Sequence, residues 1–145
     1  EYYPENQNLF YQAGLAASLT AKNSLDFELT GTDIEKKRYF DLAVSAYKRA
    51  LEIDPKHAKA VYALSVLYIF ELNRPAEAIP ILEKITEWEK KPIDHLFLLG
   101  AAYYMTGENE KAIAVYERII EISSSAEKKA KAESNIREIR SSGGR

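Results

Sequence analysis

A pattern of small and aromatic residues recurs along most of the chain at an interval of about 35 residues. Its clearest copy begins at Ile93 and consists of Leu99-Gly100, Tyr103, Ala112 and Tyr116. Moving back 35 residues reaches Ala58, which opens a second copy with Leu64-Ser65, Tyr68, Ala78 and Leu82. A third copy is reduced to Ala43, Tyr47, Ala50 and Pro55. Apolar residues spaced by three and four predict helices, so each copy predicts two helices joined by a turn.

The small residues in this pattern have distinct structural roles. Gly100 lies in the apolar stripe of the first helix of its copy and allows the second helix to approach closely. Gly107 follows Thr106 where that first helix needs a left-handed residue to end. The copy that begins at Ala58 holds 35 residues, and we expect the turn of residues 72–75 to accommodate the additional one.

The pattern resembles the tetratricopeptide repeat family, in which each unit is a pair of antiparallel helices. The resemblance implies an all-α fold: a right-handed superhelix of three helical hairpins followed by a C-terminal capping helix. We predict a single domain over residues 1–145, with repeats at about 7–57, 58–92 and 93–126. The capping helix is expected at about 126–140, and residues 141–145 are expected to be disordered.

The first hairpin departs from the pattern because it is too long. Gly14 and Ala43 are 29 residues apart, whereas the corresponding Gly100 and Ala112 are 12 apart, which leaves 29 minus 12, or 17, additional residues. Thr32-Asp33-Ile34-Glu35 has the form of a capping box and would begin the second helix. We therefore expect both helices of this hairpin to be elongated, by roughly two turns each.

Composition excludes several classes of function. Lys plus Arg total 20 and Asp plus Glu total 22, and a net charge of −2 with mixed signs does not suit a nucleic-acid partner. No apolar stretch approaches the roughly 20 residues of a transmembrane helix. The absence of cysteine fits reducing and oxidising compartments equally. The chain begins at Glu1 without Met, so a signal segment could have been removed, and the location stays unknown: cytoplasmic, or extracytoplasmic if such a segment preceded Glu1.

The sequence has no motif that indicates catalysis. It has no phosphate-binding glycine loop and no serine nucleophile motif. His57 and His95 are isolated and lack the spacing of metal ligands. We therefore expect a non-enzymatic protein without a cofactor or a metal site.

The resemblance also indicates which residues face a partner. The family exposes certain positions of each first helix on a concave surface, and these positions form a groove in the superhelix. Transferred to this sequence, the groove residues are Tyr11, Leu15, Tyr62, Val66, Ile69, Phe70, Phe97, Ala101, Tyr104 and Met105. The same transfer places Asn8, Ser18, Leu19, Lys59 and Asp94 at the remaining positions.

The character of this groove favours an apolar partner. One subgroup of the family holds a terminal carboxylate with Lys, Asn and Arg, but the matching positions here hold Tyr11, Leu15, Ala63, Asp94 and Leu98. The lining is aromatic and aliphatic, which suits an amphipathic helix or an extended apolar segment. We therefore expect a protein-interaction module that binds such a peptide.

Three alternatives remain open. The same apolar surface could join identical chains into a homo-oligomeric scaffold. The groove could be filled by the chain itself, through Tyr2-Tyr3-Pro4 or the final helix, or its aromatic residues could simply form core. Related repeats of 35 residues read single-stranded RNA, but the pattern of Gly100, Ala112 and Tyr116 and the acidic balance disfavour that function.

Overall fold

The structure, a computed structural model, describes residues 11, 12, 15 and 32–143, and all of its regular elements there are helical. The all-α prediction is thus confirmed for the described part of the chain. The chain divides into two compact units that meet in sequence between Leu67 and Tyr68. Each unit is described by itself. Repeat arrays are held together only by contacts between neighbouring helices, so two compact units can belong to one array. The single domain predicted over residues 1–145 stays a prediction.

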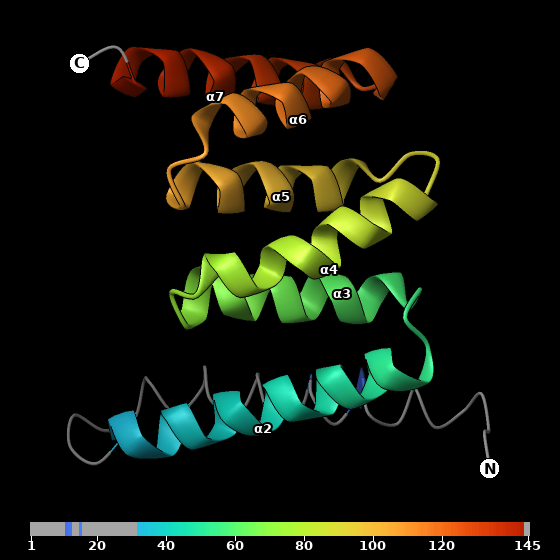
Figure 1. Ribbon diagram of the computed structural model, residues 1–145, viewed down its shortest axis with the longest axis vertical. Coiled ribbons are helices and arrows are strands. Elements are labelled where there is room, and N and C mark those ends of the chain that lie inside the picture. The colour runs from blue at the N-terminus through green and yellow to red at the C-terminus, as the bar shows by residue number, and fades with distance from the viewer. Residues whose placement is uncertain (1–10, 13–14, 16–31, 144–145) are drawn as a thin grey trace. The chain divides into compact units, whose positions relative to one another are not determined.

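The first unit contains α2 (Thr32–Ile53) and α3 (Ala58–Val66), which run in opposite directions and pack on each other (Figure 1). Helix α2 is 22 residues long, against 14 for α4 and α6, so the predicted elongation of this second helix is confirmed. The buried residues of α2 form one stripe of Phe40, Ala43, Val44, Tyr47 and Ala50. The first helix of the hairpin lies largely outside the described residues, among them Asn8, Gly14, Ser18 and Leu19; Tyr11, Gln12 and Leu15 are helical.

The second unit contains α4 (Pro75–Trp88), α5 (Ile93–Met105), α6 (Asn109–Ile122) and α7 (Ala126–Gly143). Consecutive helices pack on one another, and α5 lies between α4 and α6 (Figure 1). Pro75 occupies the first turn of α4, where its missing N–H leaves no hydrogen bond unmade. The core of this unit is built from Ala78, Leu82, Ile85, Leu96, Leu99, Ala112, Ile119, Ala132 and Ile136.

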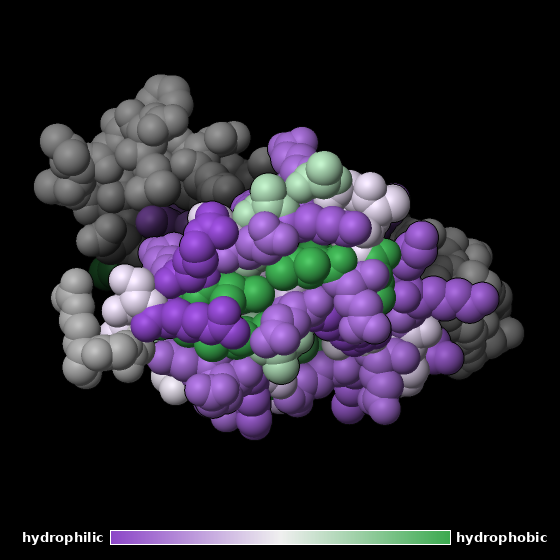
Figure 2. Space-filling view, turned by 90° about the horizontal axis from the view of Figure 1, so that it is seen from above, coloured by the Kyte–Doolittle hydropathy of each residue, from purple (hydrophilic) through white to green (hydrophobic). Residues whose placement is uncertain are grey.

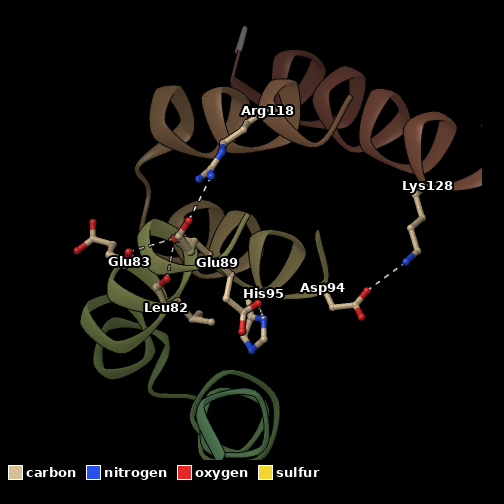
Figure 3. Close-up of polar contacts among 8 residues, drawn as sticks. Leu82, Glu83, Glu89, Asp94, His95, Arg118 and Lys128 are labelled. Carbon is tan, nitrogen blue, oxygen red and sulfur yellow. Dashed lines mark hydrogen bonds and ion pairs between the residues drawn. The ribbon is translucent and has the colours of Figure 1, made fainter. Parts of the chain in front are cut away.

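Gly100 allows α5 and α6 to approach closely. A Cβ atom built on this glycine would lie 2.5 Å from Cζ of Tyr116, whose ring is buried. Arg118 on the same helix α6 donates a hydrogen bond of 3.2 Å to the carbonyl oxygen of Thr86, at the far end of α4 (Figure 3). Helix α6 therefore packs on α5 and reaches α4 through this one hydrogen bond.

A π-helical turn, η2 (Leu67–Glu71), continues α3 and holds the additional residue of the second repeat. The combined helix Ala58–Glu71 has 9 plus 5, or 14, residues, whereas α5 has 13. The turns that follow, residues 72–74 and 106–108, are equally long. The expectation that the turn at 72–75 would hold the additional residue is therefore wrong, because a π turn contains one more residue than an α turn.

The two equivalent turns end their helices in the same way. Gly107 has φ +84° and Asn73 has φ +52°, and both residue types tolerate this left-handed conformation. The next backbone N–H returns to the helix in each case: Glu108 donates to the Tyr103 carbonyl (2.8 Å), and Arg74 donates to the Tyr68 carbonyl (2.6 Å). The first bond spans five residues and the second spans six, which again places the extra residue in the π turn.

Helix α7 continues beyond its predicted end at residue 140 and reaches Gly143. The hydroxyl of Ser142 donates to the carbonyl of Ile139 (3.2 Å) and hydrogen-bonds the hydroxyl of Tyr104 (2.9 Å). These bonds hold the last turn against α5, so residues 141–143 are helical instead of disordered. Residues 144 and 145 lie outside the described part.

Candidate partner-binding site

In the first unit, His57 fixes the beginning of α3 and contacts the preceding hairpin. Its Nδ1 accepts a hydrogen bond from the backbone N–H of Ala60 (3.2 Å), which caps the helix. Its ring lies 5.2 Å from that of Tyr11, which in turn lies 5.8 Å from the ring of Tyr47 on α2. Tyr11 is therefore half-buried between two aromatic rings, and Leu15 is half-buried as well.

Helix α3 presents Tyr62, which is 42% exposed, and the half-buried Val66. Along the same helix, Leu64 and Ser65 are buried in the interior. Tyr62 is thus the large apolar side chain that α3 leaves accessible.

The π turn separates two neighbouring residues that the sequence had assigned to the same groove. Phe70 is 59% exposed, whereas Ile69 is 1% exposed and belongs to the core. The reason is a change of register inside the π turn. The repeats match at an interval of 35 up to Tyr68 and at an interval of 34 from Ile69 onward, so Tyr68 and Ile69 both take the place of the buried Tyr103, and Phe70 corresponds to the exposed Tyr104. Ile69 therefore cannot contact a partner in this structure.

At the C-terminal end of α5, Tyr104 and Met105 are exposed (36% and 45%). Ala101, one turn earlier, is half-buried. We use the name first-helix face for these α5 residues and Phe70, which lies near the end of the preceding first helix: Phe70, Ala101, Tyr104 and Met105.

The other predicted residue of α5, Phe97, is held between two helices. Its ring lies 6.1 Å from the ring of Tyr116 on α6, and Nζ of Lys131 on α7 lies 5.2 Å from the centre of the ring. This arrangement is a cation–π contact over an aromatic pair. Phe97 is half-buried and serves to join α5, α6 and α7.

Helix α7 follows α5 along its length through three contacts. Lys128 pairs with Asp94 at the beginning of α5 (3.5 Å; Figure 3), Lys131 covers Phe97, and Ser142 bonds Tyr104. Our sequence interpretation missed these α7 residues. The spacing of Lys128 and Lys131 already places them on one side of that helix.

Two buried phenols near this face remain protonated donors. Burial raises the pKa of Tyr103, and its hydrogen bond to Glu83 and the charges of Glu83 and Glu108 raise it further. Burial also raises the pKa of Tyr116, while a hydrogen bond to Asn135 acts in the opposite direction. Such neutral hydroxyls orient neighbouring groups and do not act as nucleophiles at neutral pH.

Within residues 11, 12, 15 and 32–143 no group of three His, Cys, Asp or Glu side chains is arranged to hold a metal ion. In the same part of the chain, no helix combines the length and the apolar character that crossing a membrane requires. What this part of the chain offers is a surface for contact: exposed aromatic and thioether side chains beside lysines already engaged within the unit.

Comparison with known proteins agrees with this helical architecture. Residues 39–92 and 96–124 each match a family model described as tetratricopeptide repeat. The chain is also similar to a TPR repeat-containing protein of Borreliella burgdorferi, with 29% identity over 129 residues that cover 89% of this chain and 54% of the relative. The chain thus spans about half the length of that relative. On these matches, together with its helical hairpins, the chain belongs to the tetratricopeptide repeat family.

Proposed function

We propose that this chain is a non-enzymatic adaptor module that binds an apolar peptide or the apolar side of an amphipathic helix. The observation that carries this proposal is the exposure of Phe70 and of its equivalent Tyr104 near the ends of consecutive first helices, with Met105 exposed beside Tyr104 in the sequence. Large apolar side chains grouped on a surface favour contact with another protein.

Tetratricopeptide repeats mediate protein–protein interactions and are a non-enzymatic repeat family. The finer assignment, an apolar peptide, depends on the chemistry of the first-helix face. Phe70 and Met105 offer only apolar and thioether surface, and Tyr104 adds one hydroxyl that can accept a further hydrogen bond. No arginine, lysine or asparagine lies among the four residues of this face, so capture of a terminal carboxylate is not supported there.

The contacts of α7 limit the part of α5 that a ligand can reach. Asp94 and Phe97 are already engaged by Lys128 and Lys131, and the Tyr104 hydroxyl by Ser142, so the large apolar surfaces that remain accessible on α5 are the Tyr104 ring and Met105. A ligand therefore meets an apolar centre at the end of α5 with lysine side chains beyond it. In the first unit, Tyr62 and Val66 provide a separate apolar contact.

The size of the face sets the expected affinity. Burying on the order of 400 Å² of apolar surface at about 25 cal/mol per Å² stabilises the complex by roughly 10 kcal/mol before costs. Loss of translational freedom and ordering of the peptide cancel a large part of this gain, so we expect dissociation constants in the micromolar range.

The proposal is tested by selecting peptides from a random display library and replacing exposed residues of the face. Peptides enriched on the wild-type chain should carry apolar residues spaced by three and four. Their affinity should fall at least about tenfold for Phe70→Glu combined with Met105→Glu, because a desolvated carboxylate then opposes the apolar peptide. The measurement is fluorescence anisotropy with synthetic peptides, with circular dichroism to verify folding.

Leu42→Glu is the matched control, because Leu42 is 53% exposed on the second helix α2 and lies outside the proposed face. This variant should bind the selected peptides as the wild type does. Equal binding by the Phe70 and Met105 double variant would contradict the proposal, and so would a library that yields only acidic or basic peptides without apolar spacing.

A further inference from the structure

The outer side of α6 and α7 forms a shallow hollow that the described chain leaves uncovered. Its volume is about 320 Å³, and it is lined by Ile120, Ile136, Glu117, Glu133, Arg137 and Arg140. Figure 2 shows a hydrophobic stripe, coloured green, between hydrophilic residues on this side of the molecule. We call this surface the α6–α7 face.

The charges around this hollow are not neutralised by the described residues. Elsewhere in the unit, Lys128 pairs with Asp94 and Arg118 bonds the Thr86 carbonyl. By contrast, Glu117, Glu133, Arg137 and Arg140 form no ion pair or hydrogen bond through their side chains within residues 34–142. Two acidic and two basic groups without partners of their own thus surround a floor made by the half-buried Ile120 and the edge of the buried Ile136.

The same unit contains an equivalent surface that is covered. Helices α4 and α5 pack on each other as α6 and α7 do. Helix α6 packs on α5, with Tyr116 and Ile119 buried, and reaches α4 through the bond from Arg118 to the Thr86 carbonyl. A helix with apolar and charged residues in the right order is therefore the kind of element that fits such a surface.

The order of residues on α7 identifies that element. Glu133, Ile136, Arg137 and Arg140 are spaced by three, one and three, which places them in one row along the helix. The row begins acidic, continues apolar and ends basic. If two such rows meet in antiparallel orientation, the acidic end of each lies beside the basic end of the other.

We propose that the α6–α7 face binds a second copy of this chain in a two-fold symmetric dimer, with Glu133 of each copy facing Arg137 and Arg140 of the other. A two-fold axis near Ile136 generates both contacts at once, because the same surface is used by both copies. A partner helix of uniform charge would be attracted at one end of the row and repelled at the other, whereas this chain itself carries the reversed order. The dimer is independent of peptide binding on the first-helix face.

The dimer is tested first with the intact wild-type chain by sedimentation velocity. Two helices provide a small interface, so we expect a dissociation constant of about 100 µM and a rise in weight-average mass over the range from roughly 5 to 500 µM. The dimer should weaken as salt increases, because its specificity depends on opposite charges. A chain that stays monomeric throughout this range overturns the proposal.

Charge reversal identifies the interface. Glu133→Arg makes the row entirely basic, and Arg137→Glu with Arg140→Glu makes it entirely acidic. Each variant alone should associate at least about tenfold more weakly than the wild type, since like charges then meet twice. An equimolar mixture of the two should form a heterodimer, because the basic row of one faces the acidic row of the other.

Two controls separate this surface from the others. Glu87→Arg changes the charge in the same way on an exposed residue of α4 and should leave dimerisation unchanged. Phe70→Glu with Met105→Glu, which tests peptide binding, should also leave it unchanged. The proposed interface is incorrect if either charge-reversed variant dimerises as the wild type does, or if the mixture of the two associates no more strongly than each alone. It is also incorrect if the Phe70 and Met105 double variant abolishes the dimer.

Discussion

At Gly100, α5 and α6 lie so close that a methyl group would enter the ring of Tyr116. Three ring atoms lie within 2.9 Å of the Cβ position, and the ring is itself fixed by Phe97 and by burial. A helical Gly normally costs about 1 kcal/mol relative to Ala. The close approach of α5 and α6 therefore favours glycine at this position, although alanine has the higher helix propensity.

Gly100→Ala should lower the free energy of unfolding by about 1–2 kcal/mol, because overpacking exceeds the gain in helix propensity. Urea denaturation followed by circular dichroism measures the change. A double-mutant cycle with Tyr116→Ala should show that the two substitutions are strongly non-additive, since removing the ring makes room for the methyl group. A stabilised Gly100→Ala single variant would mean that α6 moves away without cost.

Sequence reasoning was accurate at residues whose conformation is determined locally. Gly107 adopts the left-handed conformation that its place after Thr106 predicts, and Gly100 contacts the ring that its pattern requires. Ile69 was misassigned for a different reason. Its orientation depends on how the preceding helix accommodates an extra residue, and that is decided by packing instead of by the identity of Ile69.

At the scale of elements, α3 depends on a side chain that precedes it. The helix proper has nine residues, has no acidic residue in its first turn, and begins with the bond from Ala60 N–H to His57 Nδ1. Because short helices gain little from propensity alone, such a cap contributes a substantial part of the local stability.

His57→Ala should reduce the free energy of unfolding by about 1 kcal/mol, because it removes the acceptor for the Ala60 N–H. His57→Asn keeps an acceptor at the cap and should recover most of this loss, as measured by thermal denaturation of the three chains. If the Asn variant is no more stable than the Ala variant, the contact of the His57 ring with Tyr11 is the more important one.

Helix α7 is the element whose contacts differ most from the role that its sequence predicts. Its apolar residues Ala132, Ile136 and Ile139 are buried as expected for a capping helix. Its lysines, however, contact α5 at Asp94 and Phe97 and so limit the surface that we propose for a partner. Periodicity reveals the buried side of a helix, but it does not reveal which neighbour the polar side meets.

At the scale of the whole molecule, the repeat pattern predicted the all-helical fold and the helical hairpins that follow residue 58. Such arrays gain their stability from contacts between neighbours, so the final helix protects the one before it. Helix α7 packs on α6, hydrogen-bonds Tyr116 through Asn135 and places Lys131 over Phe97 at this end of the second unit.

A chain that ends at Ser125 should therefore unfold at a lower temperature and associate non-specifically, because the apolar side of α6 is then exposed to water. Differential scanning calorimetry and light scattering measure the two effects. A chain that ends at Arg140 keeps the three buried residues of α7 and should retain most of its stability. If the shorter chain melts at the wild-type temperature, α7 does not contribute to this core.

The π turn accommodates a single-residue insertion inside a helix of this protein. The turn that follows keeps its length and its left-handed residue, and the second helix of the repeat begins directly after it, as in the third repeat. The insertion instead changes which side chain reaches the surface, exposing Phe70 and burying Ile69. A change in chain length can thus act as a specificity mutation: it exchanges the residue offered to a partner and leaves the scaffold intact.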